Sequence, residues 1–428
     1  MTEPLRLGIA GLGTVGAGVV KIIRQKAALL EARSGRPIVI SAVSAQSRTK
    51  DRGVPLGDYA WEDDPIALAK RDDVDVFVEL MGGSEGAAKA ATEAAIAADK
   101  DVVTANKALL AHHGQALAVA AEAAGRVIRF EAAVAGGIPV IKALTEGLAG
   151  NDITRVIGVM NGTCNYILTQ MQATGRGYDA LFQECADLGY LEADPNLDVG
   201  GIDAGHKLSL LAAIAFGTQV DFDNVELEGI QSITIDDITQ AADMGYRIKL
   251  LGVAQMTGRG LEQRMSPCLV PDTSPLGQLE GGTNMCVLEG DQVGQIVMRG
   301  AGAGEGPTAS AVLGDIMDIA RGLRISTFGQ PANSLKQAPS AKSATAAPYY
   351  LRLSLQDKPG ALAKIATVLG EAGISIDRMR QYSHQDPDAP VLIVTHKTTR
   401  PALDAALTQM PGTGVLTGEP VAIRIEEV

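Results

Sequence analysis

A short apolar strand that runs straight into a glycine-rich turn constrains this chain more than any other feature. Leu5–Ala10 is an apolar run, Gly11-Leu12-Gly13-Thr14-Val15-Gly16 follows it at once, and an Ala-rich stretch without proline comes next. Gly11 permits a tight turn, Gly13 lets a pyrophosphate approach the backbone, and Gly16 lets the helix pack on the strand. Since amides at a helix N-terminus attract phosphate, the pattern predicts a Rossmann-type dinucleotide site, and the alternative is a plain glycine-rich turn. The expected cofactor ligands here are Gly11, Gly13, Thr14, Val15 and Gly16.

The first part of the chain alternates short β-branched runs with longer Ala-rich runs. This alternation is typical of βαβ units and predicts an α/β fold with a doubly wound parallel sheet. The expected strands are Leu5–Ala10, Val39–Ser44, Val74–Leu80, Asp101–Thr104 and Val127–Phe130. The expected helices are Ala17–Ala32, Gly86–Ala98 and Leu109–Ala124. We therefore expect a nucleotide-binding domain over residues 1–135, with a return segment at about residues 303–325.

Residues 136–302 differ in pattern and predict an α+β domain for substrate binding and dimerisation. Its long polar, Asp-rich connection precedes an apolar helix, and the segments VELEGI (225–230) and ITIDDI (233–238) suggest further strands. The other elements expected here are a strand at Ile153–Met160 and helices at Pro139–Leu148, Thr163–Ala173, Tyr178–Leu188 and Gly201–Phe216.

The last hundred residues divide into a linker and a small module. Residues 326–347 are rich in Ser, Ala, Gln and Pro without periodicity, which is typical of a linker. Residues 348–428 show strand, helix, strand, strand, helix and strand in that order. This βαββαβ order predicts a ferredoxin-like fold.

Composition excludes several classes of protein. Hydrophobic residues make up 46% of the 428 residues and charged residues 20%, which is typical of a soluble globular protein. The formal charge of −13 disfavours nucleic acid and anionic membrane as partners, since both attract basic surfaces. No apolar run is long enough to span a bilayer, and the first residues show no signal-peptide pattern, so we expect a cytoplasmic protein. Four scattered cysteines predict reduced thiols and no zinc site.

The end of the second expected strand bears on the choice of dinucleotide. An NAD-preferring site usually has Asp or Glu there for the ribose 2′-hydroxyl, whereas this strand ends Val43-Ser44-Ala45-Gln46. Arg48, Lys50 and Arg52 follow, and cationic groups there suit a 2′-phosphate. We expect NADP(H) to be favoured over NAD(H), with a solvated basic loop as the alternative.

A cluster of carboxylates precedes the expected apolar helix. Glu192, Asp194 and Asp198 lie in the connection, and Asp203 and Lys207 are spaced i and i+4 at the start of the helix. The simplest interpretation is a surface ion pair that contributes about a few tenths of a kcal/mol. The alternative is a polar pocket in which carboxylates bind an ammonium group and a lysine held by Asp203 donates a proton to a carbonyl.

Several segments resemble homoserine dehydrogenases that carry a C-terminal ACT domain, and the resemblance covers essentially the whole chain. Its most specific part is Gly189–Lys207, because several charged residues recur there at fixed spacing. The other segments are Asn106–Ala108, Glu131–Pro139, Asn161–Leu168 and Gly302–Ala311. The resemblance implies reversible hydride transfer between NAD(P)H and L-aspartate 4-semialdehyde, which gives L-homoserine in threonine, methionine and isoleucine biosynthesis.

The resemblance also implies roles for individual residues. Lys207 would donate and accept the proton at the substrate oxygen with Asp203 as its partner, and Lys107 would lie between cofactor and substrate. The implied substrate ligands are Glu192, Asp198, Gly162, Thr163 and Tyr190. The further cofactor ligands are Arg48, Lys50, Gly82, Gly83, Ser84, Asn106, Lys107, Gly189 and Gly304. Main-chain oxygens would hold a monovalent cation, Na⁺ or K⁺, at Glu131, Val134, Gly136 and Ile138.

The C-terminal module resembles ACT domains in Asp357–Ile365 and Gly370–Asp377. It implies an amino-acid effector, for which the family nominates L-threonine. It also implies a homodimer or homotetramer, since ACT modules usually pair edge to edge. The linker before the module implies that inhibition travels through the arrangement of subunits.

Two other functions stay open at this stage. An aldehyde-oxidising dehydrogenase could use Cys164 as nucleophile, but it would need a base near the thiol. A non-catalytic sensor could bind NADP and report amino-acid levels through the C-terminal module. The charged pattern of Gly189–Lys207 disfavours the sensor.

Overall fold

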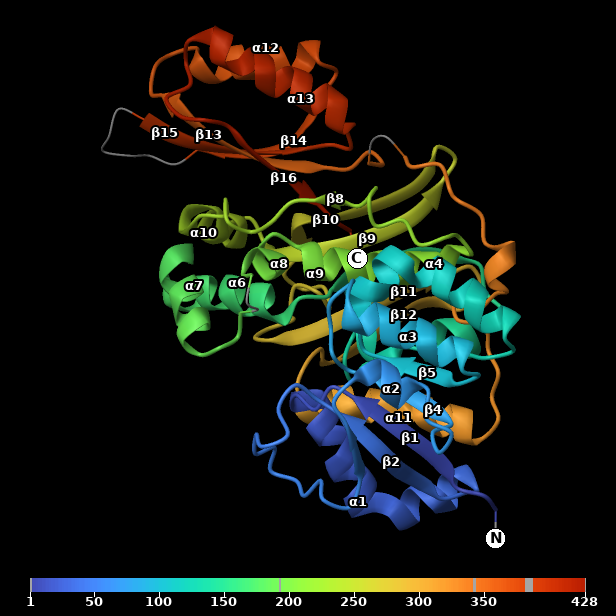
Figure 1. Ribbon diagram of the computed structural model, residues 1–428. Coiled ribbons are helices and arrows are strands. Elements are labelled where there is room, and N and C mark those ends of the chain that lie inside the picture. Colours follow the sequence, from blue (N-terminus) through green and yellow to red (C-terminus); the bar gives the residue numbers. More distant parts are fainter. Residues whose placement is uncertain (1, 192–193, 342–343, 382–387, 428) are drawn as a thin grey trace.

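The computed structural model describes residues 2–191, 194–341, 344–381 and 388–427. Two sheets organise the chain. Figure 1 shows the blue N-terminal part at one end, the green and yellow middle part next to it, and the red C-terminal part at the other end. A Rossmann-like domain, a mixed-sheet domain and a ferredoxin-like module follow in chain order, which confirms the expected fold class.

The first sheet is parallel and has the strand order β3-β2-β1-β4-β5-β6. Helices cover both of its faces, so its strands are mostly apolar, and β4 and β5 are buried at every position, with Glu79 and Thr104 as polar residues at their ends. The order reverses between β1 and β4, where open α/β sheets bind ligands beyond their carboxyl ends. The strands are β1 (Leu5–Ala10), β2 (Ile38–Ser44), β3 (Ala60–Glu62), β4 (Val76–Glu79), β5 (Asp101–Thr104) and β6 (Ile128–Arg129).

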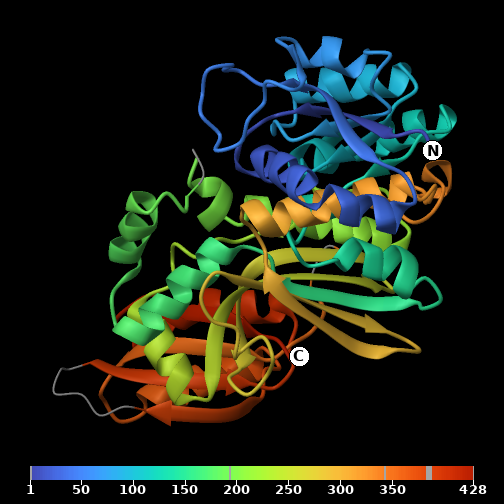
Figure 2. The same cartoon turned by 90° about the horizontal axis from the view of Figure 1, so that it is seen from below.

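A helix from late in the chain completes this first domain. Helix α11 (Glu305–Ala320) packs against α1 (Thr14–Ser34), as Figure 2 shows on the side of the domain that faces the rest of the chain. The two helices approach so closely that a Cβ on Gly18 would lie 2.7 Å from the Glu305 side chain. The remaining helices are α2 (Pro65–Ala69), α3 (Ala87–Ala97) and α4 (Lys107–Ala123).

The second sheet has the order β12-β11-β7-β9-β10-β16-β13-β15-β14, and β8 pairs with β10 outside this path. Helix α9 (Ile202–Phe216) lies between the sheet and α4, which explains why its residues are buried almost all round. The strands of the middle domain are β7 (Ile153–Val159), β8 (Glu226–Leu227), β9 (Tyr246–Thr257), β10 (Gly260–Pro271), β11 (Thr283–Gly290) and β12 (Gly294–Ala301). Its other helices are α5 (Val140–Lys142), α6 (Gly162–Thr174), α7 (Tyr178–Asp187), α8 (Asn196–Val199) and α10 (Ile235–Asp243).

The C-terminal module supplies the last four strands of the second sheet. Its antiparallel order β16-β13-β15-β14 and its two helices give the ferredoxin-like fold that the sequence predicts. Strand β16 also pairs in parallel with β10, with Leu269 opposite Ile425. The module is therefore docked on the middle domain within one chain. Its elements are β13 (Tyr349–Gln356), α12 (Ala361–Glu371), β14 (Ile376–Gln381), β15 (Asp388–Thr395), α13 (Arg400–Gln409) and β16 (Val421–Ile425).

The described residues of the segment at 326–347, which are 326–341 and 344–347, make packing contacts, in contrast to the loose linker that its composition predicts. Phe328 and Ala332 are fully buried, and Lys336 and Ser340 form bridges with the middle domain. Ser, Ala and Pro pack well when a neighbouring backbone supplies hydrogen bonds, and composition does not reveal that neighbour. Strand β16 also pairs directly with β10, so this segment is not the sole connection between the module and the middle domain.

Several local predictions differ from the structure. Residues 235–238 start helix α10 instead of a strand, because Thr234 and Asp237 form a capping box. The helix expected at Pro139–Leu148 is a short α-helix followed by a π-helical turn at Ala143–Gly147. Strands β9 to β12 were not anticipated as separate elements. Among the residues described, no helix is both long and apolar enough to cross a membrane.

Candidate functional site

A cleft of about 910 Å³ lies between the first and middle domains, beyond the carboxyl end of β5. Twelve of the residues singled out from the sequence line it: Thr14, Val15, Lys107, Val134, Gly162, Thr163, Gly189, Tyr190, Asp198, Asp203, Lys207 and Gly304. Glu192 lies outside the described residues. The elements that meet at the cleft are the starts of α1, α4, α6 and α9, so each wall carries amides or side chains from the first turn of a helix.

Asp203 holds two lysine ammonium groups in the wall of this cleft. Its Oδ2 atom lies 2.6 Å from Nζ of Lys207, and its Oδ1 atom lies 2.8 Å from Nζ of Lys107. Lys207 also donates to the main-chain oxygen of Met160 at 2.9 Å. Asp203 is 5% exposed and Lys207 is 9% exposed. The pair predicted as a possible surface ion pair is therefore a buried cluster of three charged groups.

The electrostatics of the cluster favour the ionised carboxylate. Burial alone would raise the pKa of Asp203, but the charges of Lys207 and Lys107 hold that pKa well below its usual range. Asp203 also stands in the first turn of α9, where the helix dipole favours a negative group. Asn161 donates from Nδ2 to Asp198 at 2.9 Å, so a second buried carboxylate faces the same cleft.

A polar network fixes the ends of strands β4 and β5 beside the cleft. Glu79 accepts hydrogen bonds from the amides of Met81 and Gly82 and from the hydroxyl of Thr104. Asn106 caps α4 through Leu109 N and donates to the carbonyl of Gly83 at 2.7 Å. These bonds orient the loop after β4 and the first turn of α4, which carries Lys107. Gly82, Gly83, Ser84 and Asn106 border this corner without lining the cleft itself.

The glycine-rich turn has room for a dinucleotide. Gly11 has a φ of +99°, and a Cβ there would lie 2.4 Å from the Leu80 carbonyl oxygen. A Cβ on Gly16 would lie 2.0 Å from the carbonyl oxygen of Gly11. A Cβ on Gly13 would meet no atom within 4 Å, so open space lies over the start of α1. Two glycines are therefore required by packing, and the third leaves the helix N-terminus accessible to a phosphate.

The basic loop after β2 gathers around Trp61. Arg48 and Arg52 place their guanidinium carbons 5.7 and 5.9 Å from the centre of the Trp61 ring. Arg52 also donates from Nε to the Leu12 carbonyl at 2.9 Å, which ties the loop to the glycine-rich turn. The half-buried Arg52 therefore holds the loop in place, a structural role that the sequence did not indicate. Lys50 is exposed on the same loop.

The turn that begins at Glu131 has irregular backbone next to a buried carboxylate. Glu131 accepts from the amides of Ile141 and Lys142 at 2.9 and 2.8 Å. Burial and the neighbouring Asp315 raise the pKa of Glu131 to about 7. Gly136 has a φ of +56°, and a Cβ there would lie 2.4 Å from the Gly302 carbonyl oxygen. Of the oxygens expected to hold a cation, that of Ile138 accepts from Val140 N at 2.8 Å.

Cys164 does not have the surroundings of a nucleophile. Its thiol is fully buried and donates to the Asp198 carbonyl oxygen at 3.3 Å. Burial and the nearby Asp198 and Asp203 raise the pKa of the thiol well above its usual value. The thiol is therefore protonated at neutral pH.

The sequence alone did not identify several residues of the site. Met160 acts through its carbonyl, which leaves no trace in residue type. Glu79 resembles an ordinary strand residue, although its carboxylate is fully buried. Asn284 lines the cleft, and its Oδ1 atom has no hydrogen-bond partner among the described residues. A polar residue at the start of a strand next to glycines was the only available signal for Asn284.

The chain matches known proteins over its whole length. Sequence models match at residues 11–131 (homoserine dehydrogenase, NAD binding domain), 139–317 (homoserine dehydrogenase) and 349–410 (ACT domain). Homoserine dehydrogenase of Neisseria gonorrhoeae is 41% identical and aligns with 100% of this chain and 99% of its own length. A homoserine dehydrogenase structure from Thiobacillus denitrificans has a TM-score of 0.93 at 39% identity, covering 99% of this chain and 98% of that one. A hyperthermophilic archaeal homoserine dehydrogenase in complex with NADPH has a TM-score of 0.63 at 26% identity, covering 74% of this chain and 97% of its own.

Proposed function

The chain belongs to the homoserine dehydrogenase family, and from that premise we propose how the residues of its cleft divide the work of the oxidoreductase. The reaction is the reversible reduction of L-aspartate 4-semialdehyde to L-homoserine. A bound nicotinamide dinucleotide supplies the hydride or accepts it. The protein must align the substrate carbon, exclude water and handle one proton at the substrate oxygen.

Lys207 delivers that proton, and Asp203 positions it. The observation that carries this assignment is the buried carboxylate of Asp203, which fixes both Lys207 and Lys107 at one wall of the cleft. A lysine held at two points, by Asp203 and by the Met160 carbonyl, keeps one N–H free to point at a ligand. Lys107 is more exposed and stands at the end of β5, so we assign it to the boundary between cofactor and substrate.

The substrate amino group lies near the second buried carboxylate. Asp198 lines the cleft beside Asn161, and a carboxylate there suits an ammonium group. Gly162, Thr163 and Tyr190 border the same region, and Thr163 donates to the Tyr190 carbonyl at 3.3 Å. We keep Glu192 as a further ligand on the strength of the family resemblance.

NADP(H) is the favoured cofactor. Strand β2 ends without a carboxylate, and Arg48, Lys50 and Arg52 stand on the loop that follows. The archaeal relative bound to NADPH supports this choice. The glycine-rich turn, the loop at 82–84, Asn106, Gly189 and Gly304 complete the proposed cofactor contacts.

A monovalent cation, Na⁺ or K⁺, would sit in the turn at Glu131. The proposed ligands are the main-chain oxygens of Glu131, Val134, Gly136 and Ile138. The irregular backbone of this turn supports the site, because it frees carbonyls from helix and sheet bonding. The buried carboxylates of Glu131 and Asp315 would also favour a nearby cation.

We further propose L-threonine as feedback inhibitor through the ACT domain. Asp357–Gly360 is exposed before α12, and Gly360 precedes the helix with a φ of +85°. Strand β14 lies at the edge of the sheet and supports pairing of two modules in a homodimer or homotetramer. Truncation after Ala347 would remove Tyr350 and Ile425, which belong to the same buried cluster as Leu269 of the middle domain, and would expose that part of the core. A point change in the exposed loop is therefore the better test of threonine inhibition.

The deciding experiment compares Lys207→Ala with Lys107→Ala in homoserine oxidation followed at the NADPH absorbance band. We expect Lys207→Ala to lower kcat at least about a hundredfold while NADP affinity stays nearly constant. We expect Lys107→Ala to raise the Michaelis constants as well. Equal losses of cofactor binding and turnover in Lys207→Ala would refute its role in proton transfer, and an inactive wild-type protein would favour the sensor.

A further inference from the structure

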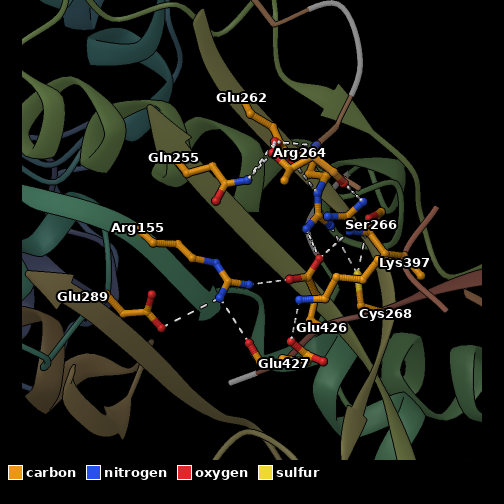
Figure 3. Close-up of polar contacts among 12 residues, drawn as sticks. Arg155, Gln255, Glu262, Arg264, Ser266, Cys268, Glu289, Lys397, Glu426 and Glu427 are labelled. Carbon is orange, nitrogen blue, oxygen red and sulfur yellow. Dashed lines mark hydrogen bonds and ion pairs between the residues drawn. The ribbon is translucent and has the colours of Figure 1, made fainter. Parts of the chain in front are cut away.

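A buried charge network joins the end of the C-terminal module to the middle domain. Glu426 follows β16 and accepts from Arg155 on β7 and from Arg264 on β10 (Figure 3). Arg424 reaches the same carboxylate at 2.5 Å, and Arg264 also pairs with Glu262 at 3.2 Å. The exposed fractions of Arg264, Glu262 and Glu426 are 3%, 3% and 4%. Little solvent therefore reaches these three residues, whereas the Arg155 side chain is 18% exposed, and the mutual contacts of Arg264 and Glu426 restrict their geometry.

Strand β7 connects this network to the lysine of the cleft. Arg155 lies near the start of β7, and Met160, whose carbonyl accepts from Lys207, follows its last residue. The five steps from Arg155 to Met160 span about 16 Å of extended chain. The strand is hydrogen-bonded to β11 on one side and to β9 on the other. A displacement of Arg155 along the strand therefore reaches the carbonyl that holds Lys207.

A second connection runs through β10 to the start of α9. Met265 follows Arg264 directly, and a Cβ on Gly201 would lie 3.0 Å from its Cγ atom. Gly201 precedes α9, which carries both Asp203 and Lys207. The Met160 carbonyl follows β7, and the helix that carries Asp203 begins against β10. Arg155 on β7 and Arg264 on β10 both bind the carboxylate of Glu426.

We propose that Glu426 is a positioning residue for Lys207, through Arg155 and strand β7 and through Arg264 and strand β10. This inference rests on the proposed role of Lys207. Its physical basis is that a buried arginine deprived of its carboxylate must move or take up water, and close packing transmits that shift along the strand.

The test compares Glu426→Gln with Glu427→Gln. Glu427 is the next residue, and its side chain forms an exposed pair with Lys397 at 3.1 Å, so it is a matched control. We expect Glu426→Gln to lower kcat about tenfold, to change the homoserine Michaelis constant less than about twofold, and to alter the pH profile of kcat. Glu427→Gln should match the wild type in all three. A folded Glu426→Gln enzyme with wild-type kcat and pH profile would overturn the inference.

Two further measurements cover the other outcomes. If Glu426→Gln does not fold, Arg155→Gln and Arg155→Lys test the β7 connection alone, and the lysine variant should restore most of the lost kcat. Wild-type kcat in Arg155→Gln would overturn that connection. Acetic anhydride labelling of Lys207, followed by mass spectrometry, does not depend on turnover. It should be at least about threefold faster in Glu426→Gln than in Glu427→Gln, and equal rates would overturn the inference even if the proposed activity failed.

Discussion

Asp203→Asn is the change that probes the centre of the cleft most directly. The substitution keeps the shape of the side chain and removes the negative charge that faces two ammonium groups at 2.6 and 2.8 Å. Lys207 and Lys107 would then repel each other across a site with 5% exposure at residue 203. Each lysine would turn toward other acceptors or toward water.

The size of the effect follows from the burial of the cluster. Removal of one partner from a buried ion pair typically costs about 3 to 5 kcal/mol, and the amide oxygen of Asn retains one acceptor, so we expect the lower value. An equal loss in the transition state would lower kcat by about a hundredfold.

The charge of Asp203 should also contribute to the free energy of unfolding, and this contribution should depend on pH. The pKa of Asp203 is depressed in the folded protein, so its contribution to stability is present above the usual Asp pKa and is lost as pH falls through the folded value. The difference in unfolding free energy between wild type and Asp203→Asn should be constant near neutral pH and shrink below about pH 4.

The assay combines steady-state kinetics of homoserine oxidation with urea unfolding. Glu93→Gln is a matched control, since Glu93 forms an i, i+4 pair with Lys89 at 2.8 Å on an exposed surface. Its loss should cost about a few tenths of a kcal/mol and leave kcat unchanged. Asp203 does not hold the two lysines as described if Asp203→Asn keeps at least a third of wild-type kcat, or if the two variants lose the same stability.

Three other predictions test separate parts of the structure. The double variant Arg48→Gln, Lys50→Gln should raise the Michaelis constant for NADP about tenfold and leave that for NAD unchanged. An unchanged ratio of the two Michaelis constants would mean that the loop is merely solvated. Cys164→Ser should retain most of the turnover, because the thiol is buried and protonated; loss of more than about tenfold in a stably folded variant would revive the thiol mechanism. Burial lowers the pKa of Lys249 from 10.5 to about 8, so the buried ammonium destabilises the fold at lower pH, and stability should rise by up to about 3 kcal/mol as pH increases from 8 to 10.5 and that cost is relieved. Urea unfolding of wild type and Lys249→Gln would show parallel pH profiles if that shift were absent.

The sequence determined the first domain and the module most completely. Leu5–Ala10 and Asp101–Thr104 are strands at the predicted residues, because strands buried in a parallel sheet are rich in apolar, often β-branched residues and each run is followed by a helix-forming stretch. The order of elements in residues 348–428 is also that of the predicted ferredoxin-like module, because the short strand-like and helix-like runs follow one another in the βαββαβ order. The i, i+4 spacing of Asp203 and Lys207 similarly indicated their contact.

The packing partners of those elements became apparent only from the tertiary structure. Periodicity could not reveal that Lys107 reaches the same carboxylate as Lys207, because the two lysines stand on helices a hundred residues apart that meet only when the domains pack. Composition suggested a loose linker at 326–347, whereas Lys336 and Ser340 of this segment form bridges with the middle domain. The pairing of β16 with β10, and the contacts of the Glu426 carboxylate with Arg155 and Arg264, depend on long-range packing. Local sequence specifies which face of an element is apolar, but the partner that covers this face is chosen by the packing of the whole chain.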